Sequence, residues 1–175
     1  MKLNVGCGSD YRQGFVNIDG SSALPNVDKI IDLSKESLRQ YFADKSVEYI
    51  LANDFIEHHF HWEAVKILND FYKLLKPGGV LQMRVPDFQR ITALWSWRSL
   101  LLSPEKKIAL LFGGQDLPQG EGDTTSRNEF PQFFCHKYAY TKKTMRSELE
   151  SIGFTNVKVK SAGTNFEVFA KKAGL

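Results

Sequence analysis

The chain has 175 residues, 42% of them hydrophobic and 25% charged, a size and composition that suit one globular domain rather than two. Its formal net charge is only +3 and its basic residues are scattered, which argues against the concentrated basic patch of a nucleic-acid-binding protein. No segment approaches the roughly 18 uninterrupted apolar residues of a membrane span. Cys7 and Cys135 lack metal-type spacing, so we expect free thiols in a reducing compartment and a cytoplasmic protein.

Strand-like and helix-like segments alternate along the chain, a pattern that favours an α/β fold. The predicted strands are residues 3–5, 15–18, 29–32, 47–52, 80–85, 156–160 and 166–170. The predicted helices are residues 35–42, 62–76, 89–102, 104–112 and 142–152, the first with Ser34 and the last with Thr141 as N-cap. Residues 113–135 are polar and aperiodic, and a loop of that length in a compact domain is usually functional or disordered.

A glycine turn follows the first predicted strand. Gly6 and Gly8 allow the backbone to turn sharply and to approach a nucleotide-like ligand closely. The second strand ends in Asp19, whose carboxylate can accept hydrogen bonds from a ribose diol. A dinucleotide fingerprint has a third glycine and places its acid about 20 residues further on, so this spacing disfavours NAD and a nicotinamide oxidoreductase.

The order of these elements, together with several short motifs, resembles a small class I S-adenosylmethionine-dependent methyltransferase over nearly the whole chain. The motifs are residues 3–8 (LNVGCG), 17–19 (NID), 31–33 (IDL), 53–58 (NDFIEH) and 74–79 (LLKPGG), the last followed by a strand and 85–87 (VPD). The resemblance implies an α/β three-layer sandwich with a seven-stranded, mostly parallel sheet whose last strand is antiparallel. It implies a single domain over residues 1–175 with a helical and loop insertion at about 87–140. The segment between the first two strands is shorter than a normal crossover, so we expect the first helix to be reduced to a turn.

The cofactor implied by the resemblance is S-adenosylmethionine. Its expected contacts are Asn4, Gly6, Cys7, Gly8, Asp19, Gly20, Asp32, Leu33, Asn53, Asp54 and Glu57. In this assignment Asp19 holds the ribose hydroxyls, Asp32 and Leu33 contact adenine, and Asp54 binds the ammonium group. Asp32 has an alternative role, because it could instead begin a helical turn with Ser34.

Three histidines, His58, His59 and His61, follow the fourth strand closely. His58 is the candidate catalytic residue, as a general base beside the methyl acceptor. The alternative is that His58 orients the loop by hydrogen bonding while His59 and His61 lie on the surface. Glu57 and His136 could complete a metal cluster, but the i, i+4 spacing of helical metal sites is absent, so no metal site is predicted.

The methyl acceptor is expected to contact residues 87–140, where Arg127 and His136 are the candidate substrate residues. This region is rich in aromatic side chains that could form an acceptor pocket or lid, core, or a homodimer surface: Trp95, Trp97, Phe112, Phe130, Phe133, Phe134, Tyr138 and Tyr140. We expect a small metabolite or sugar as acceptor, since a basic patch for nucleic acid is lacking. The alternative function is a cofactor-binding or scaffold subunit that lacks its own acceptor site and needs a partner chain.

Overall fold

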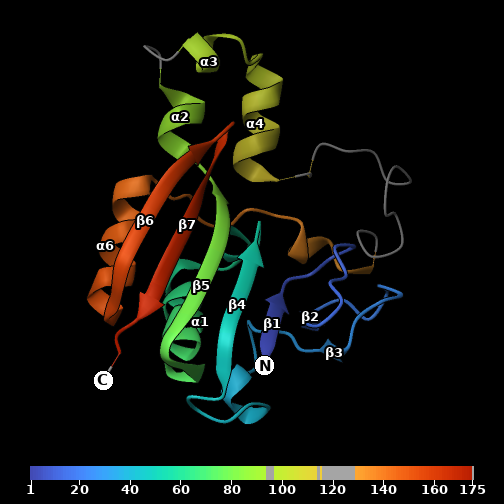
Figure 1. Cartoon of the computed structure of the whole chain (residues 1–175). Coiled ribbons are helices and arrows are strands. Elements are labelled where there is room, and N and C mark those ends of the chain that lie inside the picture. The colour runs from blue at the N-terminus through green and yellow to red at the C-terminus, as the bar shows by residue number, and fades with distance from the viewer. Residues whose placement is uncertain (94–96, 114, 116–128, 175) are drawn as a thin grey trace.

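The protein is described by a computed structural model that covers residues 1–93, 97–113, 115 and 129–174. Its centre is a seven-stranded sheet in the order β3-β2-β1-β4-β5-β7-β6 (Figure 1). The strands are β1 (Lys2–Val5), β2 (Val16–Asp19), β3 (Lys29–Ile30), β4 (Val47–Asn53), β5 (Leu75–Pro86), β6 (Phe154–Ala162) and β7 (Asn165–Lys172). β7 runs antiparallel to both of its neighbours, and the pairs from β3 to β5 are parallel. The predicted α/β fold, with a seven-stranded, mostly parallel sheet and an antiparallel last strand, is confirmed.

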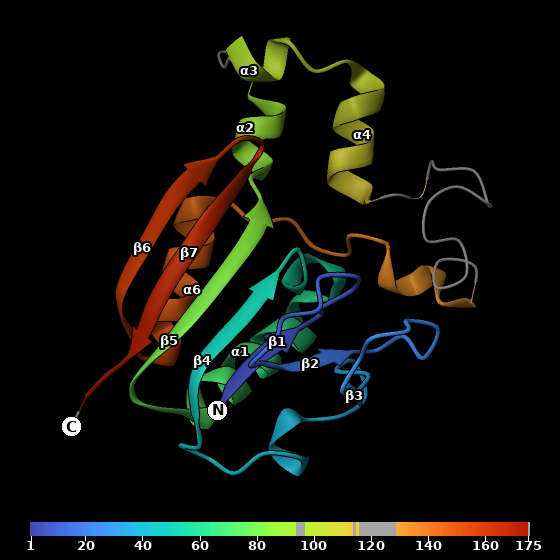
Figure 2. The same ribbon diagram turned by 45° about the vertical axis from the view of Figure 1, so that its right-hand side comes forward.

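The helices are few for this fold class. They are α1 (His61–Leu74), α2 (Phe88–Thr92), α3 (Trp97–Leu100), α4 (Pro104–Phe112) and α6 (Lys142–Ile152), with short 3-10 turns η1 (Leu38–Gln40), η2 (Ile56–His58) and η4 (Pro131–Phe133). α1 and α6 lie on the same side of the sheet in both views, while α2, α3 and α4 stand together beyond the end of β5 (Figure 1, Figure 2). Of the described helices, none is long and apolar enough to cross a membrane.

The hydrophobic core lies between the sheet and the helices on that one side. Leu81, Met83 and Val85 of β5 are fully buried, as is Phe71 of α1. Gln82, which alternates with the buried residues of β5, is only partly buried. This period-2 pattern is typical of a strand with one packed face and one more open face.

The order of the strands determines where a ligand can bind. The chain leaves β1 toward β2 and β3, and then returns to the other side of β1 to form β4. In open α/β sheets, ligands bind beyond the carboxyl ends of the strands at such a reversal. Residues 6–15 are all described and contain no helix, so the predicted reduction of the first helix to a turn is confirmed.

Three helix predictions need correction. The helix predicted over 35–42 is only the 3-10 turn η1, because the Ser34 hydroxyl donates to Asp32 Oδ1 at 2.6 Å and Ser37 forms the N-cap instead. The helix predicted over 62–76 ends at Leu74, and β5 already begins at Leu75. The helix predicted over 89–102 is interrupted, because α2 ends at Thr92 and the next residue is extended.

Candidate functional site

A cavity of about 270 Å³ opens at the carboxyl ends of β1, β2 and β4. Seven predicted cofactor residues line it: Gly6, Gly8, Asp19, Gly20, Asp32, Leu33 and Asp54. The candidate base His58 lines it as well. The lining residues that sequence reasoning did not assign to a ligand are Ser9, Ser21, Leu24, Ile31, Ser34, Phe55, His59 and Lys137. The cavity therefore collects the ends of successive strands, as the position of the strand reversal requires.

The glycine turn is the floor of this cavity. Gly6 has φ +65° and Gly8 has φ +51°, left-handed conformations that favour glycine. A Cβ on Gly6 would lie 2.2 Å from Phe55 Cδ2, so the turn also needs a residue without a side chain at this position. The backbone thus passes directly over the Phe55 ring at the end of β4.

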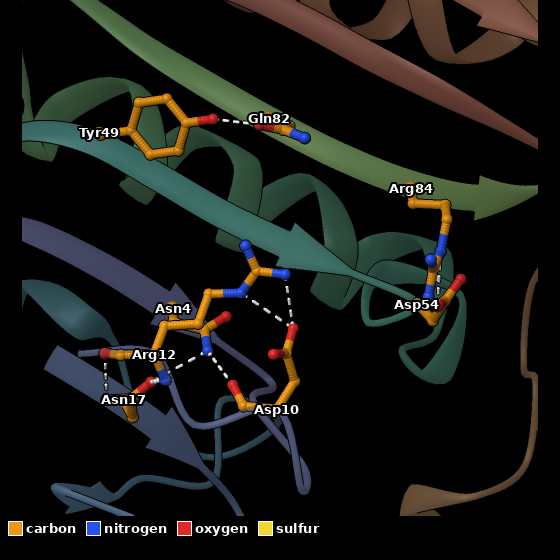
Figure 3. Close-up of polar contacts among 8 residues, drawn as sticks. All are labelled: Asn4, Asp10, Arg12, Asn17, Tyr49, Asp54, Gln82 and Arg84. Carbon is orange, nitrogen blue, oxygen red and sulfur yellow. Dashed lines mark hydrogen bonds and ion pairs between the residues drawn. The ribbon is translucent and has the colours of Figure 1, made fainter. Parts of the chain in front are cut away.

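A buried amide network holds the turn in place of the missing helix. Asn4 Nδ2 donates to the Asp10 carbonyl at 2.7 Å and to Asn17 Oδ1 at 3.0 Å (Figure 3). Asn17 Oδ1 also accepts from the Arg12 backbone N–H at 2.9 Å. Asn4 is 3% exposed and does not line the cavity. Its place in the structure is beneath the turn, where it ties β1 to β2.

The Asp19 carboxylate accepts hydrogen bonds from the glycine turn after β1 and from the loop after β2. Its Oδ2 accepts from the Gly8 N–H at 2.9 Å, and its Oδ1 accepts from the Ser21 N–H at 3.0 Å. A carboxylate offers about four lone-pair sites, so these two bonds leave acceptor capacity for a ligand. The structure places Asp19 in the cavity wall, and its bond to a ribose stays a prediction.

Asp32 and Leu33 form the next part of the wall. Asp32 Oδ1 accepts from both the Ser34 hydroxyl and the Ser34 N–H, and Oδ2 forms an ion pair with Lys35 at 2.9 Å. Burial acts to raise the pKa of Asp32, but the hydrogen bonds from Lys35 and Ser34 outweigh it and lower the pKa below its ordinary value. The carboxylate is therefore ionised at neutral pH. Asp32 therefore forms the turn with Ser34 that the sequence offered as its alternative role, and it also lines the cavity.

Asp54 reaches the cavity from the end of β4. It has φ +48°, and its carboxylate forms an ion pair with the Arg84 guanidinium of β5 (Figure 3). Asn165 Nδ2 approaches its Oδ1 at 3.5 Å. An ammonium group of a ligand would therefore share this carboxylate with Arg84.

Besides Asn4, three predicted cofactor residues lie outside the cavity wall. Cys7 is 4% exposed, and burial is the main cause that raises the pKa of its thiol to about 12. Asn53 is the last residue of β4, and Glu57 lies in η2 with 1% exposure. None of the three lines the 270 Å³ cavity.

His58 stands where the cavity wall meets the segment after η4. Its Nδ1 lies 3.1 Å from the Cys135 carbonyl, and because a carbonyl only accepts, Nδ1 carries the proton and Nε2 keeps a free lone pair. Burial is the largest cause that lowers the pKa of His58 to about 4, with repulsion from His136 next. The imidazole is therefore neutral at pH 7.

The other two histidines of this segment have different surroundings. The expectation that His59 lies on the surface is wrong, since its side chain is buried, lines the cavity and pairs with the Phe55 carbonyl at 3.2 Å. Its pKa is also lowered to about 4, mainly by burial. His61 is half-exposed and lies 2.9 Å from the Glu148 carboxylate, as expected of a surface residue.

Phe133 and Phe134, which are far from the glycine turn in the sequence, also line the cavity. A Cβ on Gly20 would lie 2.8 Å from Phe133 Cζ, so η4 packs directly on the loop after β2. Lys137 lies beside them in the wall. The aromatic run of residues 130–134 was the sequence signal for this contact, whereas no pattern singled out Lys137.

The other candidate residues within residues 87–140 do not lie together. Tyr140 belongs to the core with 1% exposure. His136 does not line the large cavity but a second, smaller one, together with Glu57. Arg127 and Trp95 lie outside the described residues, as does the side chain of Trp97. The acceptor role predicted for His136 and Arg127 stays a prediction.

Glu57 and His136 meet His58 behind the cavity wall. Ligating atoms of all three side chains lie within 4.8 Å of one another, and the two imidazole rings are 4.8 Å apart between centroids. Within the described part of the chain, neither oxygen of the Glu57 carboxyl has a hydrogen-bond partner. Burial raises the pKa of Glu57 to about 8, and lowers the pKa of His136.

Comparison with known proteins finds likeness in structure alone. No family model matches the sequence, and no curated protein matches it. A SAM-dependent methyltransferase from Archaeoglobus fulgidus superposes with a TM-score of 0.64 at 14% identity, over 98% of this chain and 85% of that one. A SAM-dependent methyltransferase from Methanosarcina mazei gives 0.63 at 19% identity, over 99% and 92%.

A third similar structure contains ligands. It is the Haemonchus contortus phosphoethanolamine N-methyltransferase 2 in complex with phosphomonomethylethanolamine and S-adenosylhomocysteine. Its TM-score is 0.56 at 13% identity, over 99% of this chain but only 48% of that one. The chain therefore has the Rossmann-like fold of S-adenosylmethionine-dependent methyltransferases.

Proposed function

We propose that this protein is an S-adenosylmethionine-dependent methyltransferase that binds its cofactor in the 270 Å³ cavity. The observation that carries the proposal is that one cavity collects the glycine turn after β1 and the acids that follow β2, β3 and β4. Each feature suits a part of the cofactor. The turn lets the backbone come close, Asp19 accepts from the ribose diol, and Asp54 faces the ammonium group.

The adenine is proposed to lie between apolar side chains and Asp32. Leu24, Ile31 and Leu33 line the cavity on this side, and they offer a flat base an apolar surface. The ionised Asp32 is an acceptor for the exocyclic amine. Asn4, which lies beneath the turn, and Cys7, which is buried within it, then act by holding its shape.

Methyl transfer needs little acid-base chemistry from the protein. The cofactor supplies an electrophilic methyl group, and alignment of the acceptor with that group accounts for much of the rate. His58 is the proposed base for an acceptor that must lose a proton, because its Nε2 lone pair is free and its ring lines the cavity.

The proposed acceptor is a small molecule, such as a metabolite or sugar. The net charge of +3 and scattered basic residues do not favour nucleic acid. Phe133, Phe134 and Lys137 are proposed to meet the acceptor side of the cavity. Both cysteines are free thiols, which supports a reducing compartment such as the cytoplasm. Nothing in the described residues favours the alternative of a subunit without its own acceptor site.

Calorimetric titration with S-adenosylhomocysteine tests this proposal. We expect saturable binding to the wild type and, for Asp19→Ala, an affinity about 10- to 150-fold lower, since hydrogen bonds to a charged group contribute about 1.5–3 kcal/mol. Asp10→Ala is the matched control, because that carboxylate lies in the neighbouring segment between β1 and β2 but is exposed and paired with Arg12. Absence of binding to the wild type at millimolar ligand, or equal affinities of the wild type and Asp19→Ala, would contradict the proposal.

A further inference from the structure

A second cavity lies behind the wall of the first. It has a volume of about 10 Å³, which is close to the space that one water molecule or one ion occupies. Glu57, His136 and Tyr140 are among its lining residues. Glu57 and Tyr140 are each 1% exposed. Within the described residues, both Glu57 carboxyl oxygens and the Tyr140 hydroxyl have no hydrogen-bond partner.

Two imidazoles converge on the same point. The ligating atoms of Glu57, His58 and His136 lie within 4.8 Å of one another. His58 donates its Nδ1 proton to the Cys135 carbonyl at 3.1 Å, so its Nε2 presents a lone pair. The His136 ring interacts with the backbone carbonyls of Leu110 and Leu111 in α4, which act to raise its pKa, but burial outweighs them and lowers the pKa. The ring is therefore neutral at pH 7 and has one acceptor nitrogen. Such bonds to backbone carbonyls are the usual outer contacts of metal-binding histidines.

The chemistry of these groups selects the occupant. Two imidazole lone pairs are acceptors, and the Glu57 carboxyl becomes a third acceptor once it is ionised, whereas a water molecule can donate only two hydrogen bonds. A buried carboxylate without a partner is costly, whereas a cation satisfies all three groups together. Two histidines and one carboxylate are ligands typical of zinc and of similar divalent transition metals.

We propose that Glu57, His58 and His136 bind one divalent transition-metal ion of the zinc class in the wall between the two cavities. Three protein ligands leave a fourth coordination position open, as in catalytic zinc sites. No metal site was predicted from the sequence because the i, i+4 spacing of helical metal sites is absent. In the structure two of the ligands come from η2 and the third, His136, from the segment after η4. An ion bound by His58 would take up the Nε2 lone pair that the proposed general base needs, so the metal-bound protein would transfer a methyl group without His58 as base. Cofactor binding in the first cavity does not depend on the metal site.

The test uses the full chain without an affinity tag, stripped with chelator and then titrated with Co²⁺. We expect the visible absorption of protein-bound cobalt at one ion per chain, and its displacement by Zn²⁺. Glu57→Gln and His136→Asn should each weaken Co²⁺ binding at least about tenfold, since even outer-shell changes at metal sites cost that much. His61→Asn is the matched control, because it removes an imidazole that also faces a carboxylate, Glu148, at the surface.

Several outcomes would overturn the metal site. They are a folded wild type that retains no Co²⁺ or Zn²⁺, variants that bind as tightly as the wild type, and binding that only His61→Asn abolishes. Circular dichroism checks that each variant is folded, and two separate ligand variants keep the test valid if one is not. Titration of the wild type with S-adenosylhomocysteine separates the two proposals, since absence of cofactor binding to the wild type refutes the methyltransferase and leaves the metal result standing.

Discussion

Replacement of Gly6 by alanine tests the geometry of the cavity floor. At φ +65° a side chain costs about 1–2 kcal/mol of backbone strain. The new Cβ would also lie 2.2 Å from Phe55 Cδ2, and overpacking of this kind costs about 1–3 kcal/mol. We therefore expect Gly6→Ala to lower the free energy of unfolding by about 2–5 kcal/mol, measured by urea denaturation with circular dichroism.

Gly8→Ala is the matched control for this prediction. Its φ is +51°, but a Cβ there meets no atom within 4 Å, so only the strain of about 1–2 kcal/mol remains. Phe55→Leu in the Gly6→Ala background should recover part of the loss, as a double-mutant cycle would reveal. If Gly6→Ala is no more destabilising than Gly8→Ala, the close approach of the turn to Phe55 is refuted.

Two further predictions concern buried titratable groups. In metal-free protein, stability should rise with pH between about 4 and 6.5, because His58 and His59 bind fewer protons folded than unfolded. It should then fall by about 2 kcal/mol toward pH 8, because folded Glu57, with its pKa raised from 4.5 to about 8, keeps a proton that the unfolded chain releases. Urea denaturation across this range would show the fall, and Glu57→Gln should remove it; a steady rise to pH 8 would contradict the assignment. Cys7 is buried and its pKa is raised to about 12, so its thiol should resist alkylation in the native protein while Cys135 reacts. Mass spectrometry would identify the labelled residue, and labelling of Cys7 before Cys135 would contradict the prediction.

The strand pattern and the glycine turn could be predicted from the sequence because both depend on local chemistry. Short apolar runs identified each strand of the sheet, although β5 begins five residues before the predicted start, at Leu75 instead of Val80. Glycine tolerates the left-handed backbone that Gly6 and Gly8 adopt, and a strand followed by two closely spaced glycines therefore predicts a sharp turn. These elements also supply most of the residues that line the cavity, so the proposed cofactor residues were the easiest part of the site to predict from the sequence.

The wrong helix prediction over residues 35–42 arose because the Ser34 side chain can bond either to the backbone of a helix or to a neighbouring side chain. Ser34 was expected to cap a helix, but its hydroxyl pairs with Asp32, two residues back, and the helix does not form there. Side chains of serine and aspartate often offer the backbone this alternative to a helix. The choice depends on tertiary surroundings that a single sequence does not contain.

The meeting of Glu57 with His136 could not be predicted from spacing. The two residues come from η2 and from the segment after η4, and they meet because the Lys137 and Tyr138 N–H groups donate to the Glu57 carbonyl at 2.8 and 3.2 Å. Backbone bonds of this kind depend on the path of the loop, and periodicity carries no information about that path.

The most direct test of the central claim is a crystal structure of the protein with S-adenosylhomocysteine. We expect the ligand in the cavity between the glycine turn and η4, with its ribose hydroxyls donating to the Asp19 carboxylate and its amino-acid end beside Asp54. Ligand density elsewhere on the protein, or a cavity that stays empty at saturating ligand, would contradict it.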